Sequence, residues 1–290
     1  MDRLKFIFVL ILFSTVGVFV KKIDLASGKI AFTRAIIGFI FLVILALFTN
    51  KKIFINQILN NKLKIIFSGF LLGLNWLFLF QSYKYTTLSI ATISCYCAPI
   101  FMLILSILFL KEKPDIKKII CIFISIIGMI LIFYNTNNSS SAFNYNHSLG
   151  ILYGILTAIC YSIVIIINKS LKGIYSLEQT LGQFFSSTVL LLIYILIFED
   201  FNFNGLDQIS AINLIIIGVV HTGFAFFVYF SSIKNISGQS VAILSYITPI
   251  FAVLISIFYL KEPINTLQVS GGILILASTF ISEKKNKTIY

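Results

Sequence analysis

The sequence predicts an all-α membrane protein in which ten transmembrane helices form two inverted five-helix repeats around a central cavity. The first observation behind this prediction is composition. Hydrophobic residues make up 59% of the 290-residue chain and charged residues 11%, with a mean hydropathy of +1.02, whereas soluble domains carry about 25% charged residues. The second is a duplication, because Leu110-Lys111-Glu112 returns at an offset of 150 (260 minus 110) as Leu260-Lys261-Glu262.

The duplication runs upstream of this motif through a large part of each half. The residues that recur at the same offset include Gly73 and Gly223, Phe80 and Phe230, Ser82 and Ser232, Lys84 and Lys234, Tyr96 and Tyr246, and Pro99 and Pro249. A constant offset indicates one duplicated unit. In membrane proteins, a duplicated half is typical of transporters that bind their substrate between the two halves.

Apolar runs long enough to cross a membrane, about 20 residues each, follow one another along the chain. The ten predicted spans are 5–21, 30–49, 64–83, 87–110, 117–134, 148–168, 178–198, 211–231, 240–260 and 266–282. The first resembles a signal peptide, but Lys21-Lys22 follows it in place of a small-residue cleavage pattern. We therefore expect a retained helix.

Residues 135–147 are polar and uncharged, which is typical of a linker. They divide the chain into a first repeat at 1–134, with spans one to five, and a second at 148–290, with spans six to ten and a short cytoplasmic tail. Because five spans is an odd number, the second repeat enters the membrane in the opposite orientation. The sequence therefore predicts an inverted repeat.

The net charge of +12 does not indicate nucleic-acid binding, because the charges lie at the ends of the spans. When the spans alternate, most Lys and Arg residues fall on the side of the N-terminus, and the loop after span seven carries Glu199, Asp200 and Asp207 on the other side. Positive charge accumulates on the cytoplasmic side. The sequence thus predicts a multi-pass inner-membrane protein, embedded in lipid, with both termini in the cytoplasm.

Pro99 and Pro249 lie near the middle of spans four and nine. A proline inside a helix frees the carbonyl four residues earlier, here that of Cys95 and Ser245. Interrupted helices at matching places in two halves point to a binding site at the middle of the membrane, with a helix-break or gating role for the prolines. The alternative is a structural kink without ligand contact.

Three further positions carry polar groups at membrane depth. Asn75-Trp76 suits a cavity wall, or an interhelical hydrogen bond beside a packed indole. His221 could bind a carboxylate or carry a proton, or could be a neutral imidazole bonded to a neighbouring helix. Arg34 lies five residues beyond Lys29, so its side chain could extend outward or face the bundle. We expect a structural or gating role for Arg34.

Hydroxyl groups add candidates at similar depth: Ser14, Tyr96, Tyr161 and Tyr246. No Asp or Glu lies near a span centre, which weakens a mechanism coupled to protons through a buried carboxylate. The four cysteines all fall in spans, and Cys95 and Cys97 point to different faces of a helix. Buried thiols that fill space explain them better than a disulfide or metal site. We predict no catalytic residues, metal or cofactor.

These motifs resemble the drug/metabolite transporter superfamily of the EamA type. The resemblance rests on Phe32-Thr33-Arg34, on the stretch from Tyr83-Lys84-Tyr85-Thr86-Thr87 through Pro99 to Leu110-Lys111-Glu112, and on His221-Thr222-Gly223 followed by Tyr246, Pro249 and Glu262. It implies a basket of ten helices whose cavity is lined by spans 1, 3, 4, 6, 8 and 9. The implied cavity residues are Ser14, Asn75, Trp76, Tyr96, Tyr161, His221 and Tyr246. One departure is that Phe184 occupies the position that matches Arg34.

The resemblance also implies function, because members export amino acids and other metabolites and some import solutes. We expect a carrier that moves a small metabolite, an amino acid or related compound, outward by alternating access. A membrane-embedded enzyme would need a nucleophile or paired carboxylates at depth, and a scaffold or sensor would not need matched prolines. Substrate, direction, coupling ion and oligomeric state stay open.

Overall fold

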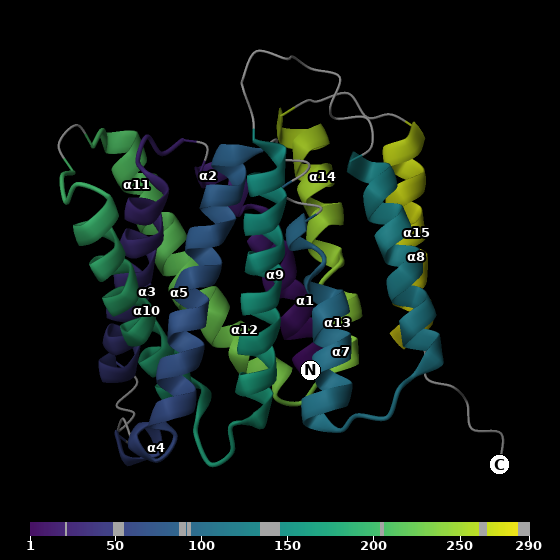
Figure 1. The fold of residues 1–290 in the computed structure, drawn as a ribbon, viewed down its shortest axis with the longest axis horizontal. Coiled ribbons are helices and arrows are strands. Elements are labelled where there is room, and N and C mark those ends of the chain that lie inside the picture. Colours follow the sequence, from purple (N-terminus) through teal and green to yellow (C-terminus); the bar gives the residue numbers. More distant parts are fainter. Residues whose placement is uncertain are drawn as a thin grey trace.

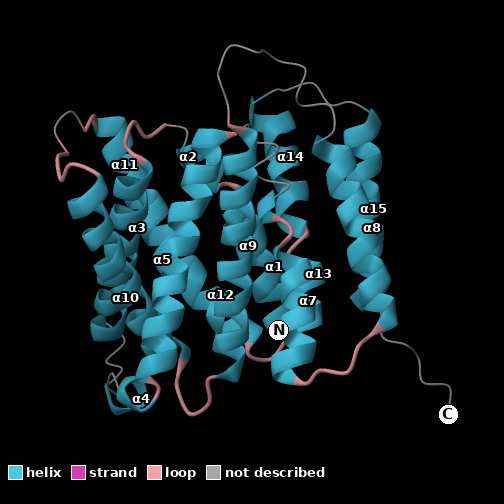
Figure 2. Ribbon diagram, in the orientation of Figure 1, coloured by secondary structure: helices cyan, strands magenta, loops and turns pink. Residues whose placement is uncertain are grey.

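The computed structural model describes residues 1–20, 22–48, 55–86, 91, 94–133, 146–203, 206–260 and 266–283, and these contain helices and turns but no β-strand (Figures 1 and 2). The helices are α1 (Asp2–Ser14), α2 (Val16–Val20), α3 (Ser27–Phe48), α4 (Ile55–Asn60), α5 (Lys62–Tyr85), α7 (Ala98–Leu110), α8 (Ile116–Phe133), α9 (His147–Ser170), α10 (Ser176–Phe198), α11 (Gln208–Ile216), the π-helix η2 (Ile217–Phe224), α12 (Ala225–Ile233), α13 (Gly238–Leu244), α14 (Ile247–Leu260) and α15 (Thr266–Glu283). Most of the linker at 135–147, Lys261-Glu262 and the tail from 284 lie outside the described residues.

Within the described residues, six helical segments are long and apolar enough to cross a membrane. They are Asp2–Val20, Ser27–Phe48, Lys62–Ser82, Ser148–Ser170, Ser176–Phe198 and Gln208–Ile233. Shorter apolar helices occupy Ala98–Leu110, Gly238–Phe251 and Val269–Ser278. The prediction of an all-helical membrane protein is confirmed, while the count of ten spans stays a prediction.

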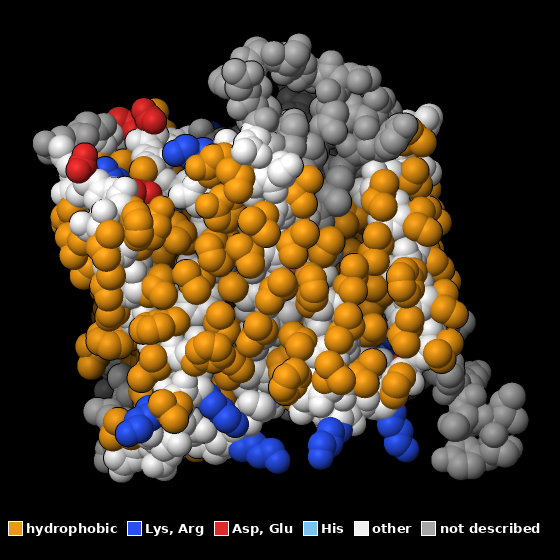
Figure 3. All heavy atoms as spheres, viewed as in Figure 1, with side chains coloured by type: hydrophobic (Ala, Val, Ile, Leu, Met, Phe, Trp, Pro, Cys, Tyr) orange, Lys and Arg blue, Asp and Glu red, His pale blue; other side chains and the backbone are white. Residues whose placement is uncertain are grey.

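The side of the molecule is apolar over the full height of the helices, and the charges gather at its two ends (Figure 3). Exposed large side chains on this surface include Phe48, Leu108, Phe109, Ile197 and Phe198. Apolar surface of this extent suits lipid rather than water. In this view, Lys and Arg side chains line one end, and most of the visible acidic side chains lie at the other end beside a few Lys or Arg side chains (Figure 3). We call these the Lys-rich end and the acidic end.

Helices from the two halves of the sequence pack against each other throughout the bundle. In the described residues, α5 packs on α9 and α10, α3 on α10 and η2, α1 on α12 and α14, and α8 on α15 (Figure 1). Close approach depends on glycine at the α5–α10 contact. A Cβ atom on Gly69 would lie 2.5 Å from the Gln183 carbonyl oxygen. The core therefore forms between the halves rather than within each one.

Two helices are interrupted at matching places. The helix geometry breaks into a turn at Tyr96–Cys97 and again at Ser245–Tyr246. Pro99 is the second residue of α7 and Pro249 the third of α14. Each proline therefore lies in the first turn of a new helical segment, where its missing N–H costs nothing, rather than kinking a continuous helix, which was the alternative.

The break also changes the expectation for a freed carbonyl. The Ser245 carbonyl accepts a backbone hydrogen bond from Thr248 at 3.2 Å, so the turn itself satisfies it. A further irregularity is η2, where the Thr222 hydroxyl donates to the Ile217 carbonyl five residues earlier, at 2.9 Å. Single π-helical turns of this kind are frequent at functional sites, and η2 carries His221.

Candidate functional site

Arg34, Trp76, Phe184 and Phe226 form a buried cluster where α3, α5, α10 and α12 meet. The Arg34 Cζ atom lies 4.7 Å from the centre of the Trp76 ring, in cation–π contact. Phe184 and Phe226 meet the same indole in edge-on contacts, with ring centroids 5.8 and 5.5 Å away. We call these four residues the Trp76 cluster.

The Trp76 cluster coincides with the sequence duplication. At the offset of 150 residues, Trp76 corresponds to Phe226 and Arg34 corresponds to Phe184. Both corresponding pairs meet here, and the Phe184 and Phe226 rings are themselves 5.8 Å apart. The cluster thus lies where the two halves of the duplication face each other. Of its four members, Arg34 alone is charged.

Arg34 is buried, with 4% of its surface exposed. Its Nε atom donates a hydrogen bond to the Thr222 hydroxyl at 3.1 Å. That hydroxyl in turn donates a hydrogen bond to the Ile217 carbonyl oxygen. The described part of the chain gives Arg34 no ion pair and no other hydrogen bond. Of the two orientations that the sequence left open, the structure has Arg34 facing the interior of the bundle.

His221 lies one residue before Thr222 and faces α1 and α2. Its Nε2 atom is 2.7 Å from the Thr15 hydroxyl, and its ring packs on Phe19 with centroids 5.1 Å apart. The Thr15 hydroxyl also lies 2.8 Å from the Leu12 carbonyl oxygen, and the histidine tautomer decides which partner donates in the bond between Thr15 and His221. This contact is the bond to a neighbouring helix that the sequence offered as the alternative.

Thr15, rather than the candidate Ser14, reaches the imidazole. The Ser14 hydroxyl donates instead to the Ile11 carbonyl of its own helix, at 2.5 Å. Asn75 turns away from the Trp76 cluster and donates to the Thr157 carbonyl of α9, at 3.0 Å. Both candidates are buried and hydrogen-bonded within the bundle.

The candidate Tyr161 pairs with a residue that the sequence analysis did not single out. Its hydroxyl donates to that of Tyr229 at 2.5 Å, and the Tyr229 ring packs on Phe6 at 5.0 Å and on Phe13 at 5.7 Å. Tyr229 lies eight residues after His221 in the sequence, which is about two helical turns on the same face. That spacing could have identified it.

The remaining candidates mark the two helix breaks. Tyr246 is fully buried, and its hydroxyl has no hydrogen-bond partner in the part of the chain described here. Tyr96 is half-buried at the other break. The structure therefore brings Arg34 and Trp76 together and bonds Arg34 to Thr222, whereas His221 contacts Thr15 and Phe19. The two tyrosines lie at the turns before α7 and α14.

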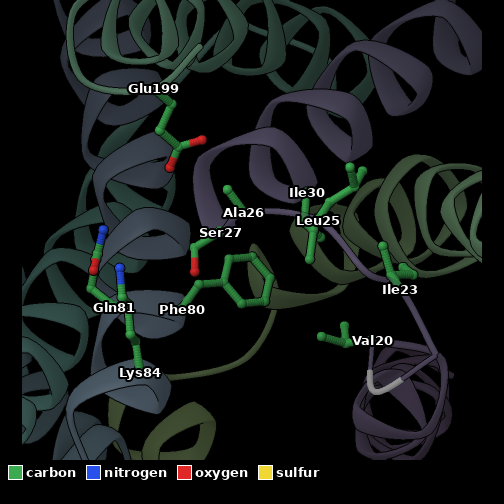
Figure 4. Close-up of a pocket in the computed structure, with 10 residues that line it drawn as sticks. All are labelled: Val20, Ile23, Leu25, Ala26, Ser27, Ile30, Phe80, Gln81, Lys84 and Glu199. Carbon is green, nitrogen blue, oxygen red and sulfur yellow. The ribbon is translucent and has the colours of Figure 1, made fainter. Parts of the chain in front are cut away.

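A cavity of about 420 Å³, whose lining is drawn in Figure 4, lies at the acidic end of the bundle. Its lining residues are Val20, Ile23, Leu25, Ala26, Ser27, Ile30, Phe80, Gln81, Lys84 and Glu199. Ile30 precedes Arg34 by four residues on α3, and Phe80 follows Trp76 by four on α5. The floor of the cavity is therefore about one helical turn, roughly 5–6 Å, from the Trp76 cluster.

The Lys-rich end is closed by contacts between the two halves. The Glu112 carboxylate, just beyond α7, accepts the backbone N–H groups of Gly238 at 2.7 Å and Gln239 at 3.3 Å, at the start of α13. The Gln239 side chain in turn donates to the Lys113 carbonyl and accepts from the Asp115 N–H. We call this set of contacts the Glu112 latch. It gives the repeated Lys-Glu motif a physical role in its first copy.

Comparisons with known proteins agree with this architecture. A model of the EamA-like transporter family matches residues 4–134 and 148–283. An uncharacterized transporter YxxF of Bacillus subtilis is 25% identical over 94% of this chain and 86% of its own length, and an uncharacterized transporter of Archaeoglobus fulgidus is 26% identical over 94% and 92%. A crystal structure superposes with a TM-score of 0.81 at 14% identity, covering 97% of each chain, and so shares the fold. The chain belongs to the EamA-like transporter family, as the resemblance implied, and is a multi-pass membrane protein.

Proposed function

We propose that the protein is a secondary transporter that exports a small metabolite, an amino acid or related compound, across the inner membrane by alternating access. In this proposal, ten spans form two inverted repeats, 1–134 and 148–290, and both termini lie in the cytoplasm together with the Lys-rich end. The observation that carries it is the position of the Trp76 cluster between a cavity and a seal. The cavity approaches it from the acidic end, and the Glu112 latch closes the opposite end.

A carrier needs a site that is exposed to one side while the other side is closed. The Trp76 cluster, with a cavity on one side and the Glu112 latch at the other end, fits an occluded state of such a carrier on its outward side, in which Ile30 and Phe80 still cover the cluster. The matched breaks before α7 and α14 supply places where helical segments can turn during the change of access. His221, Tyr161, Tyr96 and Tyr246 are proposed to line the path at other stages of the cycle.

The test uses two cysteine reporters in a background without the native cysteines. Ser27→Cys lies in the cavity wall and Ala242→Cys lies on α13, fully buried behind the Glu112 latch. A transported compound should change the reactivity of the two sites toward a membrane-impermeant maleimide in opposite directions. If both sites react in parallel under all conditions, alternating access is wrong.

Transport itself is measured in proteoliposomes loaded with a mixture of amino acids and related metabolites, by mass spectrometry of the released compounds. Protein-free liposomes are the control, and the absence of flux for every compound would contradict the proposal. Orientation is tested separately with reporters at Asp207 and Lys285, which the proposal places on opposite sides. The same side for both reporters would overturn the proposed topology.

A further inference from the structure

Arg34 is a buried cation whose charge the described part of the protein does not balance. No acidic side chain there forms an ion pair with it, and its surroundings are the aromatic rings of the Trp76 cluster. An unpaired charge at membrane depth is costly, and such residues generally pair with one another or mark a substrate path. The cation–π contact with Trp76 offsets part of this cost but leaves the charge uncompensated.

The guanidinium also keeps hydrogen-bonding capacity. Arginine carries five N–H donors, and the described residues satisfy the one on Nε, through Thr222. The two terminal nitrogens, Nη1 and Nη2, form the edge of the planar fork that binds a carboxylate through two parallel hydrogen bonds. The Trp76 indole packs against one face of the guanidinium group, so the orientation of that group is fixed before a ligand binds.

From these contacts we infer that the transported compound carries a carboxylate, which binds the Nη1 and Nη2 edge of Arg34 within the Trp76 cluster. This inference rests on the proposed transport function and deepens it by naming the substrate class. Phe184 and Phe226 would face the apolar part of the compound, because they pack on the same indole. A small carboxylic acid or amino acid has the size for this route, because ligand cavities span about 300–1,000 Å³ and this one has about 420 Å³.

The charge count favours a monoanion. Arg34 is the single cationic side chain of the Trp76 cluster. The cavity wall carries a further cation, Lys84, which lies beside Gln81, and the acidic Glu199 in the same wall opposes its charge (Figure 4). A phosphate group with nearly two negative charges would need a second cation near Arg34. Organic cations are disfavoured for the opposite reason, since Arg34 would repel them in a medium of low dielectric constant.

Access to Arg34 runs from the cavity past Ile30 and Phe80. Both side chains are 5% exposed and stand one turn above Arg34 and Trp76 on the same two helices. They separate the cavity from the Trp76 cluster, so a compound in the cavity reaches the guanidinium only when these side chains move. Arg34 would thus bind the carboxylate at a stage where the water of the cavity is excluded, and exclusion of water strengthens the charged hydrogen bonds.

The experiment measures thermal stabilisation of the purified, full-length protein by matched pairs of compounds. Each pair holds a carboxylic acid or amino acid and its amide, for example leucine and leucinamide or phenylacetate and phenylacetamide, and inorganic phosphate is tested beside them. We expect at least one acid to bind about 10- to 100-fold more tightly than its amide, because hydrogen bonds to charged groups are the stronger ones. Equal binding of acid and amide in every pair, binding of none of the acids, or binding of phosphate in their place would overturn the inference.

Two variants place the preference on Arg34. Arg34→Gln should abolish the difference in affinity between acid and amide. Arg34→Lys should retain part of that difference, because lysine keeps the positive charge but cannot donate two parallel hydrogen bonds to a carboxylate. The matched control is Lys172→Gln, which removes one positive charge from an exposed position at the Lys-rich end and should leave the difference intact. A preference for acids that survives Arg34→Gln would overturn the assignment.

The test of the carboxylate site and the test of transport can fail independently of each other. Flux of neutral or cationic compounds in proteoliposomes, without a preference for acids, would leave the transporter standing and reject the carboxylate site. Binding of acids at Arg34 without flux of any compound would reject the transporter and retain the site.

Discussion

The Glu112 latch leads to a quantitative prediction for the variant Glu112→Ala. In the structure, its carboxylate accepts the N–H groups of Gly238 and Gln239 at 2.7 and 3.3 Å. A hydrogen bond to a charged group contributes about 1.5–3 kcal/mol. Glu112 is half-buried and its second bond is long, so the low end applies and the loss is about 1.5 kcal/mol.

That loss affects only the state in which the Lys-rich end is closed, because only there does Glu112 reach α13. Since 1.4 kcal/mol corresponds to a factor of ten, the population with an open Lys-rich end should rise about tenfold. When maleimide is added from the side of the Lys-rich end, it should label the cysteine of Ala242→Cys about tenfold faster. Glu112→Gln retains one acceptor oxygen and should give an intermediate rate.

The control is Lys113→Gln. Lys113 contributes its backbone carbonyl to the latch, through the Gln239 side chain, and the substitution leaves that carbonyl in place. Its labelling rate should equal that of the parent. If Glu112→Ala labels no faster than Lys113→Gln, the carboxylate does not hold the two halves together and the reasoning from the latch fails.

Three further predictions test packing and hydrogen bonds in the bundle, each by thermal unfolding of the variants in detergent. Gly69→Ala should destabilise the protein, because its Cβ would overlap a carbonyl oxygen of α10, whereas Gly272→Ala, with open space around its Cβ, should not; equal effects would show that α5 and α10 can separate without loss. Tyr161→Phe and Tyr229→Phe each remove the same hydrogen bond, so the double variant should cost no more than either single one, and additive losses would exclude the pair. Asn75→Ala should cost about 0.6–1.7 kcal/mol, the measured range for hydrogen bonds between membrane helices, and no loss would mean that the bond to α9 is not formed.

Much of the fold follows from the sequence because the bilayer imposes a strict length and polarity on each helix. The predicted starts and ends of spans two, three, six and seven agree with α3, α5, α9 and α10 to within a few residues. Span eight was also predicted, but not its π-helical segment, since a π-turn depends on local backbone bonding that the apolar pattern does not record. Interrupted helices at Pro99 and Pro249 were expected, but not that each break comes two to four residues before its proline.

The site was predicted in part. Arg34 and Trp76 were candidates, and the structure brings them into contact, whereas the candidate His221 contacts Thr15 and Phe19. Phe226 was missed, although it corresponds to Trp76 at the offset of 150 residues. The reason is that a sequence pattern assigns each residue to a face of its own helix, whereas the cluster depends on which face of another helix it meets.

The correspondence between Arg34 and Phe184 has a consequence for energetics. If the two halves of an inverted duplication were identical, exchanging their conformations would convert the outward-facing state into the inward-facing one at no cost in free energy. The two states would then be degenerate. The pairs that differ, Arg34 with Phe184 and Trp76 with Phe226, meet at the contact between the halves, and they lift that degeneracy. In the proposed carrier, these side chains therefore contribute to the preference of the empty protein for one of the two states.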